Sequence, residues 1–256
     1  MVIHATAVID RSAEFGQDVV IGPYAIVGPD VTLADRVRIA SHAVIERNAI
    51  IGRECEIGVG AVIGSAPQDV KYRGEPTHVE IGEGTRVREY TTINRGSVAT
   101  GRTVVGRGCF LMSYVHVAHD CVLEDDVTLT NAVQLGGHVH LETGVTVGGA
   151  SAIHQFARVG TYAFIGGGSR VSQDVPPYAR AVGSPLRLYG INSVGLRRAG
   201  LSPDARLTLK RAFRLLFNSE LTTSEALERL RTEEAAAPEI TRLLEFFSRS
   251  ERGVLV

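Results

Sequence analysis

The chain has 256 residues, of which 44% are hydrophobic, and its formal net charge at pH 7 is −1. With so little net charge, neither nucleic acid nor a membrane surface is expected as a partner, and no apolar run approaches the ~20 residues that would span a bilayer. The first residues lack a basic stretch followed by a long apolar one, and the three cysteines lack framework spacing, so we expect no secretory signal, no stable membrane insertion, and a cytoplasmic protein with buried thiols.

An apolar side chain recurs at every sixth position from residue 3 to residue 171, with few exceptions. This period fits neither a helix of 3.6 residues per turn nor a plain strand with a period of two. It is typical of a hexapeptide solenoid, in which short parallel strands stack around a thin prism. In each hexad the first place is aliphatic, the fifth is small and the second is often glycine, which suits two inward side chains and a tight turn. We therefore predict an all-β parallel β-helix in which three hexads close one coil of about 18 residues.

The segment 64–80 interrupts this pattern. It is polar, contains Pro67 and Pro76, and reads as an exposed loop that leaves the column. It takes the place of three hexads, so the apolar series resumes in register at Ile81 and continues through Ala99. Long loops on rigid scaffolds often carry function, which makes this protruding loop a candidate binding element.

The hexads end at a pair of prolines, and the period then becomes helical. Ser202 followed by a proline predicts a helix N-terminus, and Thr222 with a glutamate three positions later predicts a capping box for a second helix. Pro238 begins a third amphipathic stretch. We therefore expect a hexapeptide-repeat β-helix over residues 1–185 and a small C-terminal α-helical domain over residues 186–256.

Five of the eight histidines fall within residues 116–154. Because residues one coil apart lie one above the other, His119 should lie between Gly101 and Gly137, with open space on both sides. Asp120 follows directly, and a carboxylate beside an imidazole is a general-base arrangement, because it orients the ring and stabilises its protonated form. The unobstructed N–H of Gly137 suits an oxyanion hole. Together these features indicate acyl transfer to a hydroxyl group.

Two other interpretations stay open at this point. Histidines on neighbouring coils of a β-helix can bind zinc, as in β-helical carbonic anhydrases, but those enzymes typically separate a histidine pair by four residues, whereas two residues separate His116 from His119. The second alternative is a scaffold without catalysis, in which His119 is an ordinary solvated side chain. We favour an enzyme without a metal.

Several motifs together resemble one known family. They are QDVKYRGEPT (68–77), INRG (93–96), HVAHDC (116–121), LGGH (135–138), HQF (154–156) and SQDVPPYARAVGSP (172–185). These segments are similar to the UDP-N-acetylglucosamine O-acyltransferases that begin lipid A biosynthesis, and the similarity covers nearly the whole chain. The resemblance implies a left-handed β-helix, no metal or redox cofactor, and a homotrimer with active sites between adjacent columns. The acyl donor would be a 3-hydroxyacyl thioester on acyl carrier protein, and the acceptor UDP-N-acetylglucosamine.

The resemblance also implies roles for individual residues. His119 would remove the proton from the 3-hydroxyl of the sugar, Asp120 would be its partner, and the Gly137 N–H would stabilise the tetrahedral oxyanion. Gly167 would act as the acyl-chain ruler, leaving room for a long chain. The residues implied to contact the sugar nucleotide or its neighbourhood are Asp69, Lys71, His116, His138, His154, Gln155, Asn192 and Arg198.

Two positions depart from the family pattern. Asn94 stands where some members carry histidine, and Val194 stands where some carry glutamate. These departures leave open a related acceptor with a 3-amino group, which would give an amide in place of an ester.

A basic surface for the acidic acyl carrier protein is offered by Arg197, Arg198, Lys210, Arg211 and Arg214.

Overall fold

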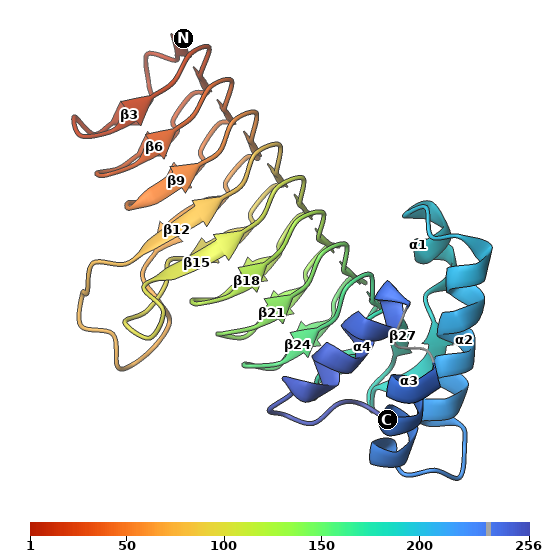
Figure 1. Ribbon diagram of the computed structural model, residues 1–256. Helices are drawn as coiled ribbons and strands as arrows, with labels where there is room; N and C mark the ends of the chain where they lie inside the picture. Colours follow the sequence, from red (N-terminus) through yellow and green to blue (C-terminus); the bar gives the residue numbers. More distant parts are fainter. Residues whose placement is uncertain (234–236) are drawn as a thin grey trace.

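The computed structural model describes residues 1–233 and 237–256, and it shows a long column of stacked coils with a group of helices at its C-terminal end (Figure 1). The column is a left-handed parallel β-helix with three faces, here called faces A, B and C, each a sheet of short strands. The predicted fold class is therefore confirmed.

The strands of each face follow one another from coil to coil. Face A contains β1 (Val2–Ile3), β4 (Val20–Ile21), β7 (Arg38–Ile39), β10 (Glu56–Ile57), β13 (Arg86–Val87), β16 (Phe110–Leu111), β19 (Thr128–Leu129), β22 (Thr146–Val147), β25 (Phe164–Ile165), β27 (Ala179–Val182) and β28 (Arg187–Ile191). Face B contains β2 (Val8–Ile9), β5 (Ile26–Val27), β8 (Val44–Ile45), β11 (Val62–Ser65), β14 (Thr92–Asn94), β17 (His116–Val117), β20 (Gln134–Leu135), β23 (Ala152–Ile153) and β26 (Arg170–Val171). Face C contains β3 (Glu14–Phe15), β6 (Thr32–Leu33), β9 (Ala49–Ile51), β12 (His78–Ile81), β15 (Arg102–Val105), β18 (Val122–Leu123), β21 (His140–Leu141) and β24 (Arg158–Val159).

The core of the column is the stack of first-place and fifth-place side chains. Val20 pairs with Arg38 and Ile21 pairs with Ile39, which is the register of three hexads predicted for a regular coil. Ile21 and Ile39 point inward and are at most 2% exposed, and the small fifth-place residue Val19 is fully buried. Each coil therefore buries one large and one small apolar side chain per face, and this burial drives the stacking.

The three cysteines occupy fifth places and are buried, as predicted. Burial raises the pKa of the Cys55 and Cys109 thiols to about 11 and that of Cys121 to about 12. Because the thiolate is the reactive form, these side chains are core packing rather than nucleophiles.

The turns between faces place the left-handed backbone conformation mostly on residues other than glycine. Asp30, Tyr114 and His138 are examples, with φ values of 57°, 63° and 61°. The glycine at the second place of the hexad has another reason. A Cβ on Gly28 would lie 1.8 Å from the carbonyl oxygen of Glu46, so glycine is needed there because the next coil approaches too closely for a side chain.

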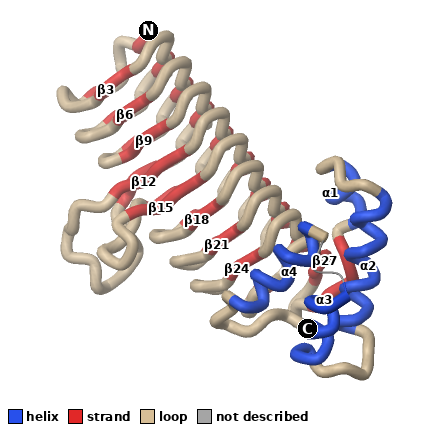
Figure 2. Tube along the Cα trace, viewed as in Figure 1, coloured by secondary structure: helices blue, strands red, loops and turns tan. Residues whose placement is uncertain are grey.

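Two coils are longer than the rest. Ile57 lies beside Val87, and Val87 lies beside Leu111. Counted along the sequence, the first of these coils exceeds the regular length of three hexads by two hexads, and the second exceeds it by one. The extra residues form segments 66–77 and 95–101, which separate β11 from β12 and β14 from β15. Both segments leave the column where face B meets face C, and they lie beside each other at the start of β12 and β15 (Figure 2).

Because both insertions are whole numbers of hexads, the apolar period passes through them unchanged and hides their true length. The prediction that the first loop replaces three hexads was wrong, since β12 continues on the next face after two extra hexads. The prediction of an inward Ala99 was also wrong, because Ala99 lies exposed in the second insertion.

Over its described residues, the C-terminal part adds one antiparallel strand and four helices. β28 pairs antiparallel with β27, and the helices are α1 (Ser193–Arg198), α2 (Pro203–Phe217), α3 (Thr223–Glu233) and α4 (Pro238–Ser248). The side chain of Ser202 accepts the Ala205 N–H at 3.1 Å, and Thr222 and Glu225 bond reciprocally, which confirms both predicted caps. No helix within the described residues is both long enough and apolar enough to cross a membrane.

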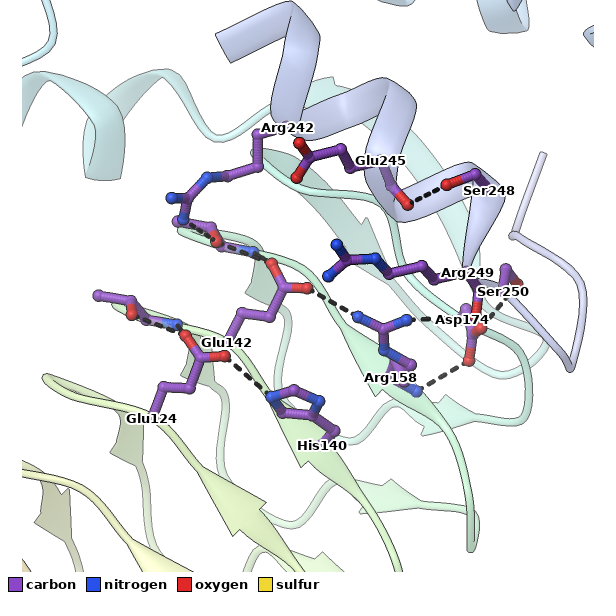
Figure 3. A network of polar contacts seen from close by, with 12 residues as sticks. Glu124, His140, Glu142, Arg158, Asp174, Arg242, Glu245, Ser248, Arg249 and Ser250 are labelled. Atoms are coloured by element: carbon purple, nitrogen blue, oxygen red, sulfur yellow. Dashed lines mark hydrogen bonds and ion pairs between the residues drawn. The ribbon is translucent and has the colours of Figure 1, made fainter. Parts of the chain in front are cut away.

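Asp174 ties the end of the chain to the last coil of the column (Figure 3). Its carboxylate accepts the Arg158 main-chain N–H at 2.8 Å and the Ser250 hydroxyl at 2.7 Å. Its main-chain N–H donates to the Gly253 carbonyl at 3.1 Å, and its carbonyl accepts the Leu255 N–H at 2.8 Å. Because Asp174 is only 1% exposed, water cannot replace these partners.

Side-chain bonds extend this tie to α4 (Figure 3). The Arg158 guanidinium donates to Glu142 at 3.1 Å and to the carbonyl of Arg249 at 3.2 Å. Arg242, on α4, donates to the Thr161 hydroxyl at 2.9 Å. The helices are therefore fixed to the column by several bonds to its last coils.

Replacing Asp174 by alanine should lower the free energy of unfolding by about 2–3 kcal/mol, because a buried N–H and a hydroxyl lose their acceptor. Urea denaturation followed by circular dichroism measures this change. The control is Asp10→Ala, since the Asp10 carboxylate accepts similar bonds from Ser12 in an exposed turn, where water replaces the lost acceptor. Equal effects of the two substitutions would contradict the proposed tie.

Candidate active site

His119 and Asp120 lie in the turn from β17 to β18, where face B meets face C. The His119 Nδ1 is 2.7 Å from the Asp120 Oδ2, the imidazole is 14% exposed and the carboxylate is fully buried. Because His119 and Asp120 are adjacent in one tight turn, the buried carboxylate lies on the Nδ1 side of the imidazole. This hydrogen bond leaves Nε2 as the ring nitrogen that faces away from Asp120.

Asp120 is held from three sides by the second insertion and β15. The carboxylate Oδ1 accepts the Ser97 N–H at 2.9 Å and the Thr100 hydroxyl, and the Asp120 N–H donates to the Thr103 hydroxyl at 2.8 Å. Burial opposes ionisation of Asp120, but the hydrogen bonds from Ser97, Thr100 and His119 outweigh it and lower its pKa to about 2. The carboxylate is therefore charged at neutral pH, so His119 Nδ1 donates and Nε2 carries the free lone pair.

Gly137 lies directly against the His119 ring from the next coil. A Cβ there would be 2.8 Å from the His119 Cε1 and 2.9 Å from Nε2. Within residues 1–233 and 237–256, no main-chain acceptor takes the Gly137 N–H. Gly101 does not flank the ring on the other side as predicted, because a Cβ on Gly101 would meet no atom within 4 Å. The ring therefore has one glycine neighbour, not two.

Two more of the predicted histidines surround this pair. The His138 Nε2 lies 3.5 Å from the Asp120 Oδ2, and its ring stacks on Phe156. His116 Nδ1 lies 2.7 Å from the Thr92 hydroxyl. Burial lowers the pKa of both rings, and the neighbouring His119 adds to the lowering. Both rings therefore favour the neutral form, in which each offers one hydrogen-bond donor and one acceptor.

The first insertion brings Asp69 and Lys71 to the same corner. The Asp69 Oδ1 accepts the Lys71 N–H at 2.9 Å, and the Lys71 side chain is exposed. The charge of Asp69 opposes the lowering of the His138 pKa, which places the loop within electrostatic reach of the histidines. Asp69 thus acts on His138, and Lys71 is exposed two residues further along the same loop.

His154 and Gln155 lie at the same corner, one coil beyond His138 and two coils beyond His119. The His154 Nδ1 is 3.0 Å from the Gln155 carbonyl oxygen, and both side chains are exposed. Gln155 stacks on the coil below so closely that a Cβ on Gly136 would be 2.7 Å from its main-chain nitrogen. These residues extend the polar group along the corner.

The remaining predicted residues lie at other corners of the column. Asn192 caps α1 and donates to the Tyr162 carbonyl at 3.0 Å, where face C turns into face A. Arg198 is exposed at the end of the same helix. In Figure 1 the loop at the start of β12 and helix α1 lie at opposite edges of face C. Gly167 is exposed where face A turns into face B, against Gly149. One chain therefore does not bring these three residues to His119.

Sequence reasoning missed the residues that hold Asp120, namely Ser97, Thr100 and Thr103. A signal was present, because Ala99 is the one small residue in a series otherwise made of isoleucine, leucine, valine and phenylalanine. A small residue at the first place of a hexad, where a large aliphatic one is expected, together with Gly96 before it, indicates a segment that has left the column.

The zinc alternative can be tested on the donor atoms. His119, Asp120 and His138 form a group whose donor atoms lie within 4.8 Å of one another. Two ligands bound to one tetrahedral zinc at about 2.0–2.1 Å are roughly 3.3 Å apart. The 2.7 Å between His119 Nδ1 and Asp120 Oδ2 is too short for such a pair and is typical of a charge-assisted hydrogen bond. The arrangement therefore fits a shared proton better than a metal.

Known proteins resemble this chain in sequence and in structure. A family profile described as UDP N-acetylglucosamine O-acyltransferase, domain 2, matches residues 174–255, and a bacterial transferase hexapeptide profile matches residues 12–47. The acyl-(acyl-carrier-protein)–UDP-N-acetylglucosamine O-acyltransferase of Alkalilimnicola ehrlichii is 48% identical over 99% of this chain and 98% of its own, and that of Thermodesulfovibrio yellowstonii is 47% identical over 98% of both.

Solved structures agree with the sequence matches. The UDP-N-acetylglucosamine O-acyltransferase of Moraxella catarrhalis superposes with a TM-score of 0.97 at 42% identity, over the full length of both chains. The Acinetobacter baumannii structure superposes with a TM-score of 0.96 at 40% identity, again over both full chains. The chain therefore belongs to the UDP-N-acetylglucosamine O-acyltransferase family.

Proposed function

We propose that this protein transfers a 3-hydroxyacyl group from acyl carrier protein to the 3-hydroxyl of UDP-N-acetylglucosamine, the first step of lipid A biosynthesis. The family relationship supports the substrates, and one observation in the structure carries the chemistry. That observation is the imidazole of His119, whose Nδ1 is bonded to the charged Asp120 and whose Nε2 lies against Gly137. A base and an oxyanion donor are thus side by side.

The reaction uses these groups in sequence. The His119 Nε2 takes the proton of the sugar 3-hydroxyl as its oxygen attacks the thioester carbonyl, and Asp120 stabilises the imidazolium that results. The Gly137 N–H donates to the tetrahedral oxyanion. When the intermediate collapses, the carbon–sulfur bond breaks and the departing thiolate of the carrier protein takes the proton back from His119. The products are the 3-O-acyl sugar nucleotide and the free carrier thiol.

The polar residues around His119 are suited to bind the sugar nucleotide. Lys71 supplies an exposed positive charge beside Asp69 on the protruding loop, which suits a negatively charged nucleotide and sugar hydroxyls. His116 and His138 lie next to His119, and their lowered pKa favours the neutral ring, which can both donate and accept a hydrogen bond. The exposed side chains that extend this surface one coil beyond His138 are His154 and Gln155.

We propose that the complete site forms between neighbouring subunits of a homotrimer. Asn192 and Arg198 lie at a different corner from His119 within one chain, so they reach the same nucleotide only from an adjacent column. A three-fold arrangement of columns brings unlike corners together. Gly167, at the third corner, would border the acyl chain in the same interface, where the absence of a side chain leaves room for a long chain.

The donor is carried by an acidic protein, and α2 offers it a basic surface. Lys210, Arg211 and Arg214 are exposed on α2, and opposite charge steers association of two proteins. With carrier protein and nucleotide as substrates, we propose that the enzyme works in the cytoplasm. An acceptor with a 3-amino group would use the same base and oxyanion donor, so only product analysis separates the two acceptors.

Purified protein can be incubated with acyl carrier proteins that bear 3-hydroxyacyl chains of different lengths, and with UDP-N-acetylglucosamine and its 3-amino analogue as acceptors. It should give one 3-O-acyl product, identified by mass. His119→Ala should lower kcat at least a hundredfold, because general-base catalysis contributes roughly that much. His4→Ala, which changes an exposed histidine on the first coil, should leave kcat unchanged.

Other products would redirect the proposal. A 3-N-acyl product from the amino analogue alone would identify the related N-acyltransferase. Turnover that disappears with a chelator and returns with zinc would support the metal alternative. No turnover with any acyl thioester would leave a scaffold. A His119→Ala variant with most of its activity would remove the base assignment.

The charge of Asp120 also predicts a dependence of stability on pH. Its pKa in the folded protein is about 2, below the ordinary 3.8, so the stability that it contributes is present above pH 3.8 and is lost as the pH falls toward 2. The thermal midpoint of Asp120→Asn, at one protein concentration, should therefore fall less between pH 4 and pH 2 than that of the wild type. Asp30→Asn, which changes an exposed turn residue, serves as the control, and an unchanged slope in Asp120→Asn would contradict the assignment.

A further inference from the structure

The second insertion, residues 95–101, is here called the bracket. It lies between β14 and β15 and contacts both the protruding loop and the catalytic carboxylate. A Cβ on Gly96 would lie 2.2 Å from the Arg102 nitrogen, so the bracket folds tightly back onto β15. The Gly101 N–H donates to the Ser97 carbonyl at 2.8 Å, which closes the bracket into a compact turn.

At one end of the bracket, Arg95 holds the protruding loop. Its side chain is buried, and its guanidinium donates to the Gly64 carbonyl at 2.7 Å and to the Tyr72 hydroxyl at 3.3 and 3.1 Å. The guanidinium also lies over the Tyr72 ring, 5.5 Å from its centroid. Gly64 belongs to β11, and the Glu46 Oε1 lies 3.9 Å from the guanidinium, so these contacts fix Arg95 to the column. The bonds to Tyr72 then hold the loop against this fixed, buried charge.

Tyr72 connects Arg95 to the loop residues that face the site. Its hydroxyl donates to the Glu75 carbonyl at 2.8 Å, and its N–H donates to the Asp69 carbonyl at 3.0 Å. The turn 69–72 carries Asp69 and Lys71 and ends at Tyr72. Through the hydroxyl of Tyr72 this turn is connected to Arg95. The positions of both loop side chains depend on this contact.

At the other end of the bracket, Ser97 and Thr100 hold Asp120. Both bond to Oδ1, and His119 bonds to Oδ2. The two carboxylate oxygens are therefore divided between the bracket and the base. The orientation of the carboxylate, and with it that of the imidazole, is set by the bracket.

We infer that the bracket is a positioning element with two separable effects: Arg95 and Tyr72 set the loop for binding of the sugar nucleotide, and Thr100 sets Asp120 for catalysis by His119. None of these three residues contacts the reacting atoms. The inference rests on the proposed function for its kinetic consequences, but not for its structural ones.

Tyr72→Phe should raise KM for the sugar nucleotide about tenfold and leave kcat within about twofold, because only the hydroxyl bonded to a charged group is removed. Arg95→Lys should change KM in the same direction. The matched control is Tyr114→Phe, since Tyr114 is exposed and stacks on Tyr90 where face A turns into face B. Its kinetic constants should equal those of the wild type.

Thr100→Val should show the opposite pattern, an effect on kcat without an effect on KM. It removes a hydroxyl from Asp120 without changing side-chain size, so kcat should fall about tenfold while KM for the sugar nucleotide stays unchanged. Thr100→Ser keeps the hydroxyl and should restore most of kcat. A general loss of folding would not be corrected by serine, and it would not separate kcat from KM.

Hydrogen exchange of the loop amides decides the structural part without substrate. Exchange within residues 66–77 should be faster in Tyr72→Phe than in the wild type and unchanged in Thr100→Val. The inference is overturned if exchange is the same in all three proteins, or if both variants change kcat and KM alike. A wild type that makes no acyl sugar while Tyr72→Phe still loosens the loop would reject the proposed function and keep the positioning role.

Discussion

Main-chain hydrogen bonds between successive coils fix the position of every residue in this column. Each coil pairs in parallel register with the next, and the inward side chains of one large and one small residue per face fill the space between them. A regular coil cannot shift by one residue without turning its core side chains outward. Every outward or corner residue is therefore placed by its count along the chain. The proposed catalytic arrangement depends on this, because Gly137 meets the His119 ring only when the two coils are in register.

The insertions break the regularity without disturbing the register, and both serve the same corner. The first carries Asp69 and Lys71 outward, and the second closes behind Asp120. Thus a fold whose three corners are equivalent by geometry acquires one corner with a buried carboxylate bonded to an imidazole. The other two corners carry Gly167 and the pair Asn192 and Arg198. A substrate that contacts the residues of all three corners has to lie between neighbouring columns.

Much of the fold could be predicted from the sequence, because a six-residue apolar period and helix caps such as Ser202 are local signals. The length of the two insertions could not, since two added hexads in one coil and one in the next return the period to its place. The pairing of His119 with Asp120 was visible because the residues are adjacent. The hydrogen bond from Thr100 to Asp120 was not visible. Thr100 lies in the second insertion, where counting three hexads per coil no longer tells which residues are neighbours. Gly101 was misplaced for the same reason.

The central claim is that one site takes residues from two chains, because the column holds His119 and Arg198 at different corners. The most direct measurement is activity of mixed trimers made from His119→Ala and Arg198→Ala chains with different tags, purified through both tags. Each mixed trimer contains one junction at which an intact His119 meets an intact Arg198 of the neighbour, so about one third of wild-type activity should return from two nearly inactive parents. Mixed trimers no more active than their parents would contradict the account, because they would place both residues in the site of a single chain.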